Sequence, residues 1–503
     1  MSEPPVNSGR AHPARGEAAA PGEVRFALKT DAATRGPAPA LPPTQRSRVA
    51  LGLTSAAAVG RFELQVCQDC GAVQYPPREA CHRCLSVRLR WTLQSGDGEL
   101  LAETTLFHSN SEFFRERLPW RLGMVRLDCG PTVITHLHGQ VPGAPVRVRV
   151  GMQLDRGGQG VLFAFPDGSA DTSGSKPDSD LDSVPGSRGA SANMNSSPAR
   201  LSIADDKQLR EMTSDPKGRQ VLITDGTSAV GMALARACVA AGAAKVWLGH
   251  SGASLTLQAL EELGGRSRVT PIPLDVTSLD SVKWAANEIA ETVDIVINNA
   301  ELFGSGELQG PTELQRSAES HAAVATPDQS AAQVAPTEFH RSAGTSDRST
   351  ATPAPTENDV HYFGLLRLTE EFGPVMRARA AGGEPFLMVW VNLLSIQAVA
   401  DLPPYATSSA SKAAAAYSLS QSLRAQMQPA GIRVVNVFPG PIADKAGEAL
   451  SLPKIEPGAL ARAIVQALQD GVEDVYPGDV ASEWLTRSRD NPKALEREMA
   501  AGR

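Results

Sequence analysis

The sequence predicts a multidomain protein in which a small ribbon and an all-β barrel precede an α/β doubly wound parallel sheet. Two observations support this prediction. Four of the six cysteines stand in two Cys-x-x-Cys pairs early in the chain. From about residue 216, short apolar runs alternate with helix-like segments, which is typical of a parallel sheet covered on both faces.

Composition marks the boundaries of these regions. Residues 1–55 are rich in Pro, Ala, Gly and Arg without periodicity, so we expect a disordered tail. The stretch at 305–357 is also of low complexity, and because it interrupts a folded region we expect a surface insertion there. The predicted order is tail 1–55, ribbon and barrel 56–166, linker 167–215, parallel-sheet domain 216–486 and C-terminal tail 487–503.

Bulk properties exclude several classes of protein. The formal net charge of −7 over 503 residues gives no case for a polyanion-binding protein. No apolar run reaches the ~18 residues of a membrane span, and the N-terminus lacks the layout of a secretory signal. The cysteines are too few and too clustered for a disulfide framework, so we expect a cytoplasmic protein without membrane contact.

The paired cysteines predict a metal site. Cys67 and Cys70 form the first pair, Cys81 and Cys84 form the second, and ten residues separate the pairs. Two such turns supply the four thiolates that Zn²⁺ binds as a tetrahedron. Because no coordination position stays open, the zinc would be structural. Four unrelated buried cysteines are the alternative.

Five short strand-like runs follow the cysteines, separated by Gly/Pro turns. This pattern favours a small antiparallel barrel of the OB-fold type. The runs are Gly98–Phe107, Arg121–Asp128, Thr132–His138, Pro145–Val150 and Val161–Phe165.

The order of ribbon and barrel resembles the DUF35-type family of zinc-ribbon/OB-fold proteins. The resemblance covers about residues 60–166 and rests on the segment CQDCGAVQYPPREACHRC, a later VRLDCG turn and a late VGM. Members of that family accompany thiolases and related acyl-CoA enzymes, sometimes fused to another domain. The resemblance therefore implies a thiolase-like or other acyl-CoA enzyme as partner.

An OB-fold also raises nucleic-acid binding as an alternative, which would need a basic groove with stacking aromatic side chains. Residues 61–166 hold 12 Arg, no Lys and 10 acidic residues, which is close to neutral. Phe107, Phe113, Phe114 and Trp120 could stack on bases, but we expect them to serve packing instead.

The second region begins like a dinucleotide-binding fold. The β-rich run Gln220–Thr224 is followed by a turn containing Gly226 and Gly231 and then by a helical segment, Met232–Ala241. A strand, a glycine turn and a helix form the context in which a pyrophosphate binds, and the alternation that follows predicts a Rossmann-like sheet. The further strands are expected at Lys245–Leu248, Val269–Leu274, Asp294–Asn298, Phe386–Leu394 and Arg433–Phe438.

This region resembles the short-chain dehydrogenase/reductases over about residues 216–480. The motifs that match, in order, are Asp275-Val276, Asn298-Asn299-Ala300, Ser395 after an apolar strand, Lys412 on the next helix, and Pro439-Gly440. The family oxidises or reduces carbonyl compounds with NAD(P). The resemblance implies that any cofactor would lie against Thr224, Gly226, Gly231, Asp275, Asn298, Pro439 and Gly440.

The sequence departs from the family's cofactor motif, T-G-x-x-x-G-x-G. Its three glycines align with Asp225, Ala229 and Gly231, so only the last is kept. Glycine is used there because the backbone approaches phosphate closely, and an aspartate would add a repelling charge. Glu301 replaces a further glycine. We therefore expect poor NAD(P) binding, and retained binding is the alternative.

The catalytic motif is also incomplete. The family's tyrosine aligns with Ser408, whose hydroxyl is a far weaker acid than a phenol, and its helix asparagine aligns with His361. Ser395 and Lys412 are kept, and Tyr405 could replace the tyrosine only if the turn before the helix rearranged.

These observations favour an accessory or scaffold subunit in acyl-CoA metabolism with a non-catalytic reductase-like domain. Such a subunit could pair with an acyl-CoA enzyme and with an intact reductase subunit. The helices Leu365–Met376 and Ala410–Leu423 match those that pack subunits together in the family, so we expect an oligomer. The alternatives are an active NAD(P)-dependent oxidoreductase on a hydroxyacyl or ketoacyl thioester and a nucleic-acid-binding OB-fold protein.

Overall fold

The structure of the protein is a computed structural model. It describes residues 40–43, 47–167, 206–252, 261, 263, 265, 267–299, 355–383, 387–400, 411–444 and 452–500. Nearly all of the insertion predicted at 305–357 lies outside these residues, and so does most of the linker predicted at 167–215.

The cysteine-rich region is a three-stranded antiparallel ribbon in the order β2-β1-β3. A short helix precedes it and contributes Leu53 and Ala57 to the same core as the barrel. The elements are α1 (Leu51–Ala58), β1 (Glu63–Cys67), β2 (Val73–Gln74) and β3 (Leu89–Leu93).

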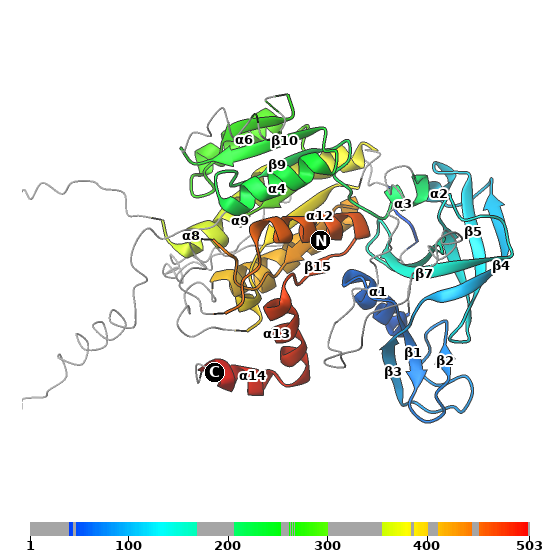
Figure 1. Cartoon of the computed structure of the whole chain (residues 1–503). Coiled ribbons are helices and arrows are strands. Elements are labelled where there is room, and N and C mark those ends of the chain that lie inside the picture. Colours follow the sequence, from blue (N-terminus) through cyan, green and yellow to red (C-terminus); the bar gives the residue numbers. More distant parts are fainter. Residues whose placement is uncertain are drawn as a thin grey trace, which may run out of the picture. The chain divides into compact units, whose positions relative to one another are not determined.

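The next five strands close into a barrel in the order β4-β5-β6-β8-β7 (Figure 1). This confirms the predicted OB-fold. Alternate side chains such as Leu100, Val125 and Val148 are fully buried inside the barrel, as the two-residue repeat of a strand requires. The elements are β4 (Asp97–Leu106), α2 (Glu112–Arg115), β5 (Trp120–Leu127), β6 (Thr132–Leu137), β7 (Val146–Leu154) and β8 (Gly160–Pro166).

The second region is a seven-stranded parallel sheet in the order β11-β10-β9-β12-β13-β14-β15. The order reverses at β9, so the sheet is doubly wound and the predicted Rossmann-like fold is confirmed. The strands are β9 (Gln220–Ile223), β10 (Lys245–His250), β11 (Val269–Pro273), β12 (Ile295–Asn298), β13 (Val389–Leu393), β14 (Arg433–Val437) and β15 (Asp474–Val475).

Helices cover both faces of this sheet. Helices α4 and α12 pack on one face and contact each other, and helices α6, α9 and α11 pack on the other face (Figure 1). The helices are α4 (Ala229–Ala240), α6 (Leu279–Ile289), α8 (Glu357–His361), α9 (Phe363–Ala381), the π-helix η7 (Ala414–Ser420), α11 (Gln421–Met427), α12 (Pro457–Asp470), α13 (Asp479–Asp490) and α14 (Pro492–Ala500).

Three segments predicted to lack structure are ordered. Part of the expected N-terminal tail forms α1, and the end of the expected linker forms α3 (Lys207–Arg210). The expected C-terminal tail contains α14, whose Leu495 and Met499 join the core of the parallel-sheet domain. Each segment is short and gains its structure by burying a few apolar side chains, which composition alone does not reveal.

Arg433 is a fully buried charge that joins three parts of the chain. From β14 it donates hydrogen bonds to the backbone carbonyls of Met212 (2.6 Å) and Leu154 (2.9 Å). Its Nε lies 4.0 Å from Oε1 of Glu473, whose side chain is 16% exposed. Burial lowers the pKa of Arg433, and burial also raises the pKa of Glu473. The guanidinium therefore satisfies carbonyl groups on β7 and after α3 that would otherwise lie buried without a donor.

Replacing this guanidinium should strongly destabilise the protein. We expect Arg433→Met to lower the free energy of unfolding by about 3–5 kcal/mol, because it leaves carbonyls and the Glu473 carboxylate without their partner. Urea unfolding followed by circular dichroism measures the loss. The matched control is Arg487→Met, which removes surface pairs with Glu483 and Glu498 and should change stability by about 1 kcal/mol or less. Equal effects of the two substitutions would contradict this assignment.

Candidate functional site

The four ribbon cysteines meet in one cluster. Their sulfur atoms all lie within 4.8 Å of one another. The Sγ atoms of Cys67 and Cys84 are 3.5 Å apart, and those of Cys70 and Cys81 are 3.6 Å apart. Four thiolates about 2.3 Å from a tetrahedral zinc ion would be separated from one another by slightly more than these two pair distances. The cluster therefore fits Zn²⁺ without rearrangement of the chain.

The local backbone favours the thiolate form that zinc needs. Backbone N–H groups of Cys84 and Arg83 lower the pKa of the Cys81 thiol. His82 lies inside the second knuckle, but its Nδ1 is 3.3 Å from Oε1 of Gln74. Four cysteines complete a tetrahedron, so a bound zinc would hold the ribbon together and offer no open position for a reactant.

The residues predicted to lie near a dinucleotide come together at the carboxyl ends of β9 and β12. The Thr224 hydroxyl lies 3.3 Å from Oδ1 of Asn298 and accepts from the backbone N–H of Asn299 at 3.0 Å. Asn299 in turn accepts from the Asp225 N–H (2.9 Å) and donates to the Asp225 carbonyl (2.7 Å). The first turn is thus fixed to the neighbouring strand by side-chain amides.

The Asp225 carboxylate closes the turn just before α4. Its Oδ1 accepts hydrogen bonds from the Thr227 N–H at 2.9 Å, the Thr227 hydroxyl at 2.8 Å and the Ser228 N–H at 3.3 Å. The Ser228 hydroxyl caps the helix by accepting from the Gly231 N–H at 3.0 Å. The carboxylate thus takes the two amides that precede the helix, and the cap takes one amide of the first turn.

The two glycines of this turn have packing roles of their own. A Cβ atom on Gly231 would lie 1.9 Å from the Asp225 carbonyl oxygen, and one on Gly226 would lie 2.6 Å from Cβ of Leu248. Both positions need glycine to close the turn against β10. Their presence is therefore explained by packing and is no evidence of a bound phosphate.

The other predicted cofactor residues also have partners within the protein. Oδ1 of Asp275 accepts from the N–H and hydroxyl of Thr277, closing the turn before α6. The Pro439 carbonyl accepts from the Ile396 N–H at 2.9 Å, and the Gly440 N–H lies 3.3 Å from the Pro477 carbonyl. These contacts bring the ends of β11, β13 and β14 to the same edge as the turn at Asp225.

The retained catalytic residues lie at this edge as well. Ser395 follows β13, is 9% exposed and accepts a hydrogen bond from the Gln397 N–H at 3.2 Å. Lys412 is buried on the helix that leads into η7. Ser408 and Tyr405, the other hydroxyl-bearing residues considered from the sequence, lie outside the described residues.

Two polar clusters near this edge escaped the sequence analysis. His361 is buried, and its Nδ1 lies 2.8 Å from Oγ of Ser411. In the second cluster, Asn392 on β13 donates to Oδ1 of Asn436 on β14 at 3.1 Å, and Ser420 donates to the same oxygen at 2.6 Å. Asn392 is the one polar residue in the apolar run of β13, and it could have indicated the second cluster. The His361–Ser411 pair could not be predicted in this way, because 50 positions separate the two residues in the sequence.

Family models match three successive segments of the chain. Residues 54–89 match the rubredoxin-like zinc ribbon domain of ChsH2, and residues 91–158 match the C-terminal OB-fold domain of ChsH2. Residues 219–326 match the short chain dehydrogenase model. The chain joins a ChsH2-type zinc ribbon and OB-fold to a short-chain dehydrogenase domain.

Solved structures similar to the chain cover its short-chain dehydrogenase domain. A short-chain dehydrogenase from Burkholderia cenocepacia J2315 in complex with NADP is 26% identical, with a TM-score of 0.43, over 57% of this chain and 98% of that one. One from Streptomyces avermitilis is 23% identical, with a TM-score of 0.39, over 57% and 97%. The 3-ketoacyl-(acyl-carrier-protein) reductase from Brucella melitensis complexed with NADH is 20% identical, with a TM-score of 0.36, over 52% and 96%.

No curated protein matches the chain. Among the helices of the described residues, none combines the length and the apolar character needed to cross a bilayer.

The turn before α4 departs from the dinucleotide site that the fold family uses. A pyrophosphate bound to the Thr227 and Ser228 amides would have to displace the Asp225 carboxylate from three hydrogen-bond donors. It would then lie beside that carboxylate, and two unit charges about 4 Å apart repel by roughly 1 kcal/mol in water and about 4 kcal/mol at an effective dielectric constant of 20. We therefore derive no hydride-transfer step for this domain.

The zinc site leads to a prediction on metal content. We expect the purified protein to contain one zinc per chain and Cys81→Ser to contain about tenfold less, because removing one thiolate opens the tetrahedron. Atomic absorption of the dialysed protein measures this. The matched control is Cys129→Ser, which removes a cysteine outside the cluster and should keep the metal. Full zinc content in the Cys81→Ser variant would show that the cluster is not the metal site.

Proposed function

We propose that this protein is an accessory subunit that assembles with an acyl-CoA enzyme of the thiolase type. Its ChsH2-type ribbon and OB-fold would make the contact with the partner enzyme. Its short-chain dehydrogenase domain would contribute shape for assembly and no hydride transfer. The observation that carries this proposal is the Asp225 carboxylate, which bonds the amides of Thr227 and Ser228 and places a negative charge just before α4.

The catalytic groups support the same proposal. A short-chain dehydrogenase uses a phenol as its proton donor or acceptor, with a pKa lowered from about 10 by a neighbouring lysine. This chain places Ser408 at the tyrosine's position and His361 at that of the helix asparagine. His361 bonds to Ser411, and Ser395 accepts from the backbone of its own turn, which supports structural roles for these side chains.

An active NAD(P)-dependent oxidoreductase on a hydroxyacyl or ketoacyl thioester is the alternative function. The buried His361–Ser411 pair beside Lys412 is the observation that favours it, because histidine can relay a proton. That function needs a bound dinucleotide, so cofactor binding separates the two candidates.

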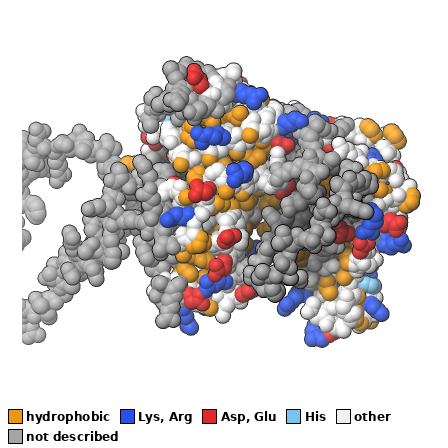
Figure 2. Space-filling model, in the orientation of Figure 1, with side chains coloured by type: hydrophobic (Ala, Val, Ile, Leu, Met, Phe, Trp, Pro, Cys, Tyr) orange, Lys and Arg blue, Asp and Glu red, His pale blue; other side chains and the backbone are white. Residues whose placement is uncertain are grey.

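Nucleic-acid binding by the barrel receives less support. Of the four aromatic side chains considered from the sequence, Phe113 and Trp120 are 3% and 1% exposed, and Phe114 packs between them. Phe107 is exposed without an aromatic partner within the described residues. Figure 2 shows basic and acidic side chains interspersed over the visible face, without the broad basic surface that binding a polyanion requires.

The dehydrogenase domain also offers a surface for self-association. The side chains of Leu365, Leu368 and Met376 on α9 are buried in the core of the domain itself. This side of α9, which was predicted to contact another subunit, therefore faces inward. Phe363 on α9 and Tyr417 on η7 remain 41% and 49% exposed. We propose that the outer sides of these two helices, and not their buried faces, form any contact between copies.

Cofactor titration tests the loss of dinucleotide binding. We expect calorimetry to detect no binding of NADH or NADPH to the wild-type protein at millimolar concentration. The double variant Asp225→Gly/Ala229→Gly frees the amides of Thr227 and Ser228 and removes the repelling charge. It should bind at least about tenfold more tightly than the wild type, since each 1.4 kcal/mol is a factor of ten. Micromolar binding to the wild type would support the oxidoreductase instead.

Co-purification tests the proposed partnership. We expect the full-length protein, isolated under mild conditions from the cells that produce it, to carry an acyl-CoA enzyme in stoichiometric amount, as determined by mass spectrometry. Cys81→Ser should release that enzyme because it opens the ribbon, whereas Cys129→Ser should retain it. A protein that emerges alone in both forms would refute the accessory role, whatever the outcome of the cofactor titration.

A further inference from the structure

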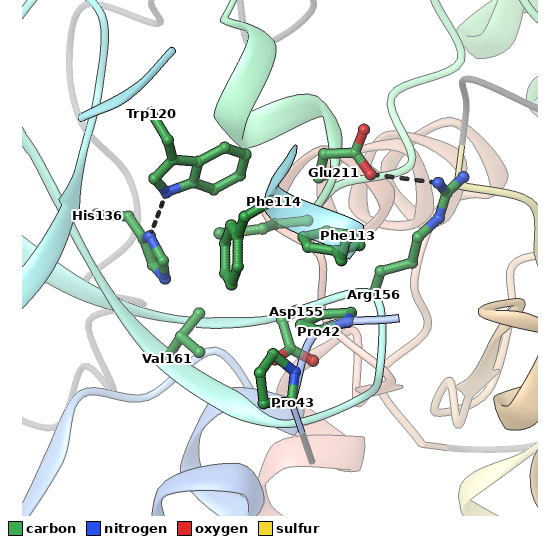
Figure 3. Close-up of a pocket in the computed structure, with 11 residues that line it drawn as sticks. Pro42, Pro43, Phe113, Phe114, Trp120, His136, Asp155, Arg156, Val161 and Glu211 are labelled. Atoms are coloured by element: carbon green, nitrogen blue, oxygen red, sulfur yellow. Dashed lines mark hydrogen bonds and ion pairs between the residues drawn. The ribbon is translucent and has the colours of Figure 1, made fainter. Parts of the chain in front are cut away.

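The barrel holds a cavity of about 280 Å³ at the side where α2 and the segment after α3 cover its strands. Aromatic and apolar side chains form most of its wall, and a small group of charged side chains forms the rest (Figure 3). The lining residues are Pro42, Pro43, Phe113, Phe114, Trp120, His136, Asp155, Arg156, Val161, Glu211 and Met212.

The aromatic wall is a fixed arrangement of rings. The Phe113 and Phe114 ring centroids are 5.1 Å apart, and those of Phe114 and Trp120 are 5.3 Å apart, both edge to face. The indole N–H of Trp120 donates to Nδ1 of His136 at 2.9 Å. Because Nδ1 accepts this bond, the proton of the neutral imidazole must lie on Nε2. The wall therefore presents ring faces and edges in fixed orientations.

The charged wall is neutral in sum. Glu211 lies between two arginines, with Oε1 3.0 Å from Nε of Arg117 and Oε2 3.3 Å from Nη1 of Arg156. Asp155 is a second buried carboxylate beside the cavity. Arg156 lines the cavity and Arg117 pairs with Glu211 from outside the lining, so the two guanidinium groups balance the two carboxylates and leave no net charge to attract an ion. An ionic ligand would lose its hydration without a counter-charge.

The size of the cavity is informative. The cavity is open to solvent over part of its surface, and the buried side chains of Phe113 and Trp120 form part of its wall. An apolar cavity of about 150 Å³ can hold benzene, which leaves room here for a molecule with one or two rings. Pro42 and Pro43 form one edge and Glu211 the opposite edge, so segments outside the barrel strands complete the wall (Figure 3).

From these observations we infer that the cavity is a binding site for a small, neutral, mainly apolar ligand that carries one or two rings. The rings of Phe114 and Trp120 contact such a ligand by edge and face. The balanced charges at the opposite wall supply polar contact for a neutral hydrogen-bonding group. This site is separate from the start of α4 and does not depend on the absence of dinucleotide binding.

A pair of fluorescent probes tests the inference on the full chain. 1-Aminonaphthalene is a neutral pair of fused rings whose emission shifts to shorter wavelengths in apolar surroundings, and 8-amino-1-naphthalenesulfonate adds one sulfonate to the same two rings. We expect the neutral probe to bind one per chain with micromolar affinity and the anionic probe to bind at least tenfold more weakly. Equal affinities would contradict the assignment of a neutral ligand, and no shift of the emission of either probe would refute the site.

Two substitutions decide whether the probe lies in this cavity. Val161→Phe fills the cavity from β8 and should weaken binding of the neutral probe at least tenfold. The matched control, Met124→Phe, introduces the same ring at an exposed position of the barrel and should change binding less than twofold. Zinc content and circular dichroism check folding, and Pro43→Trp at the exposed edge replaces Val161→Phe if that variant does not fold. Unchanged binding in a folded, cavity-filled variant would overturn the inference.

Discussion

A carboxylate closes the turn that leads into the first helix of the parallel sheet. Asp225 accepts from the amides of Thr227 and Ser228, and Ser228 caps α4 through Gly231. A helix N-terminus attracts anions because its first N–H groups lack partners and its dipole is positive there. Asp225 places an internal negative charge directly before that terminus, and we propose that this charge disfavours a bound phosphate while the sheet and helices keep the shape of a dehydrogenase.

The other module is organised by metal geometry and by burial. Four cysteine sulfurs cluster in the ribbon, where they would hold zinc, and the barrel continues directly from its third strand. Arg433 then bonds the end of β7 and the segment after α3 to the parallel sheet. The two modules thus share buried hydrogen bonds, which is consistent with the accessory role that we propose.

Much of this fold was predictable from the sequence. The strands of the barrel and sheet stand out as short β-branched runs between Gly and Pro, and the Cys-x-x-Cys spacing predicts the metal cluster. The short helices α1, α3 and α14 were not predicted, because tertiary burial of a few side chains decides their structure. The sequence already showed that Asp225 places a charge where the cofactor motif has its first glycine. The bond of Asp225 to the amide two residues on, typical of Asp and Asn in turns, could also have been inferred. The cavity in the barrel could not, since its wall draws on residues from 42 to 212.

A crystal structure grown with millimolar NADPH tests the closed phosphate site most directly. We predict electron density for the Asp225 carboxylate on the amides of Thr227 and Ser228, and no dinucleotide at the start of α4. A pyrophosphate bound to those amides, with the nicotinamide facing a side-chain hydroxyl beside Lys412, would contradict the proposal that this domain serves assembly alone.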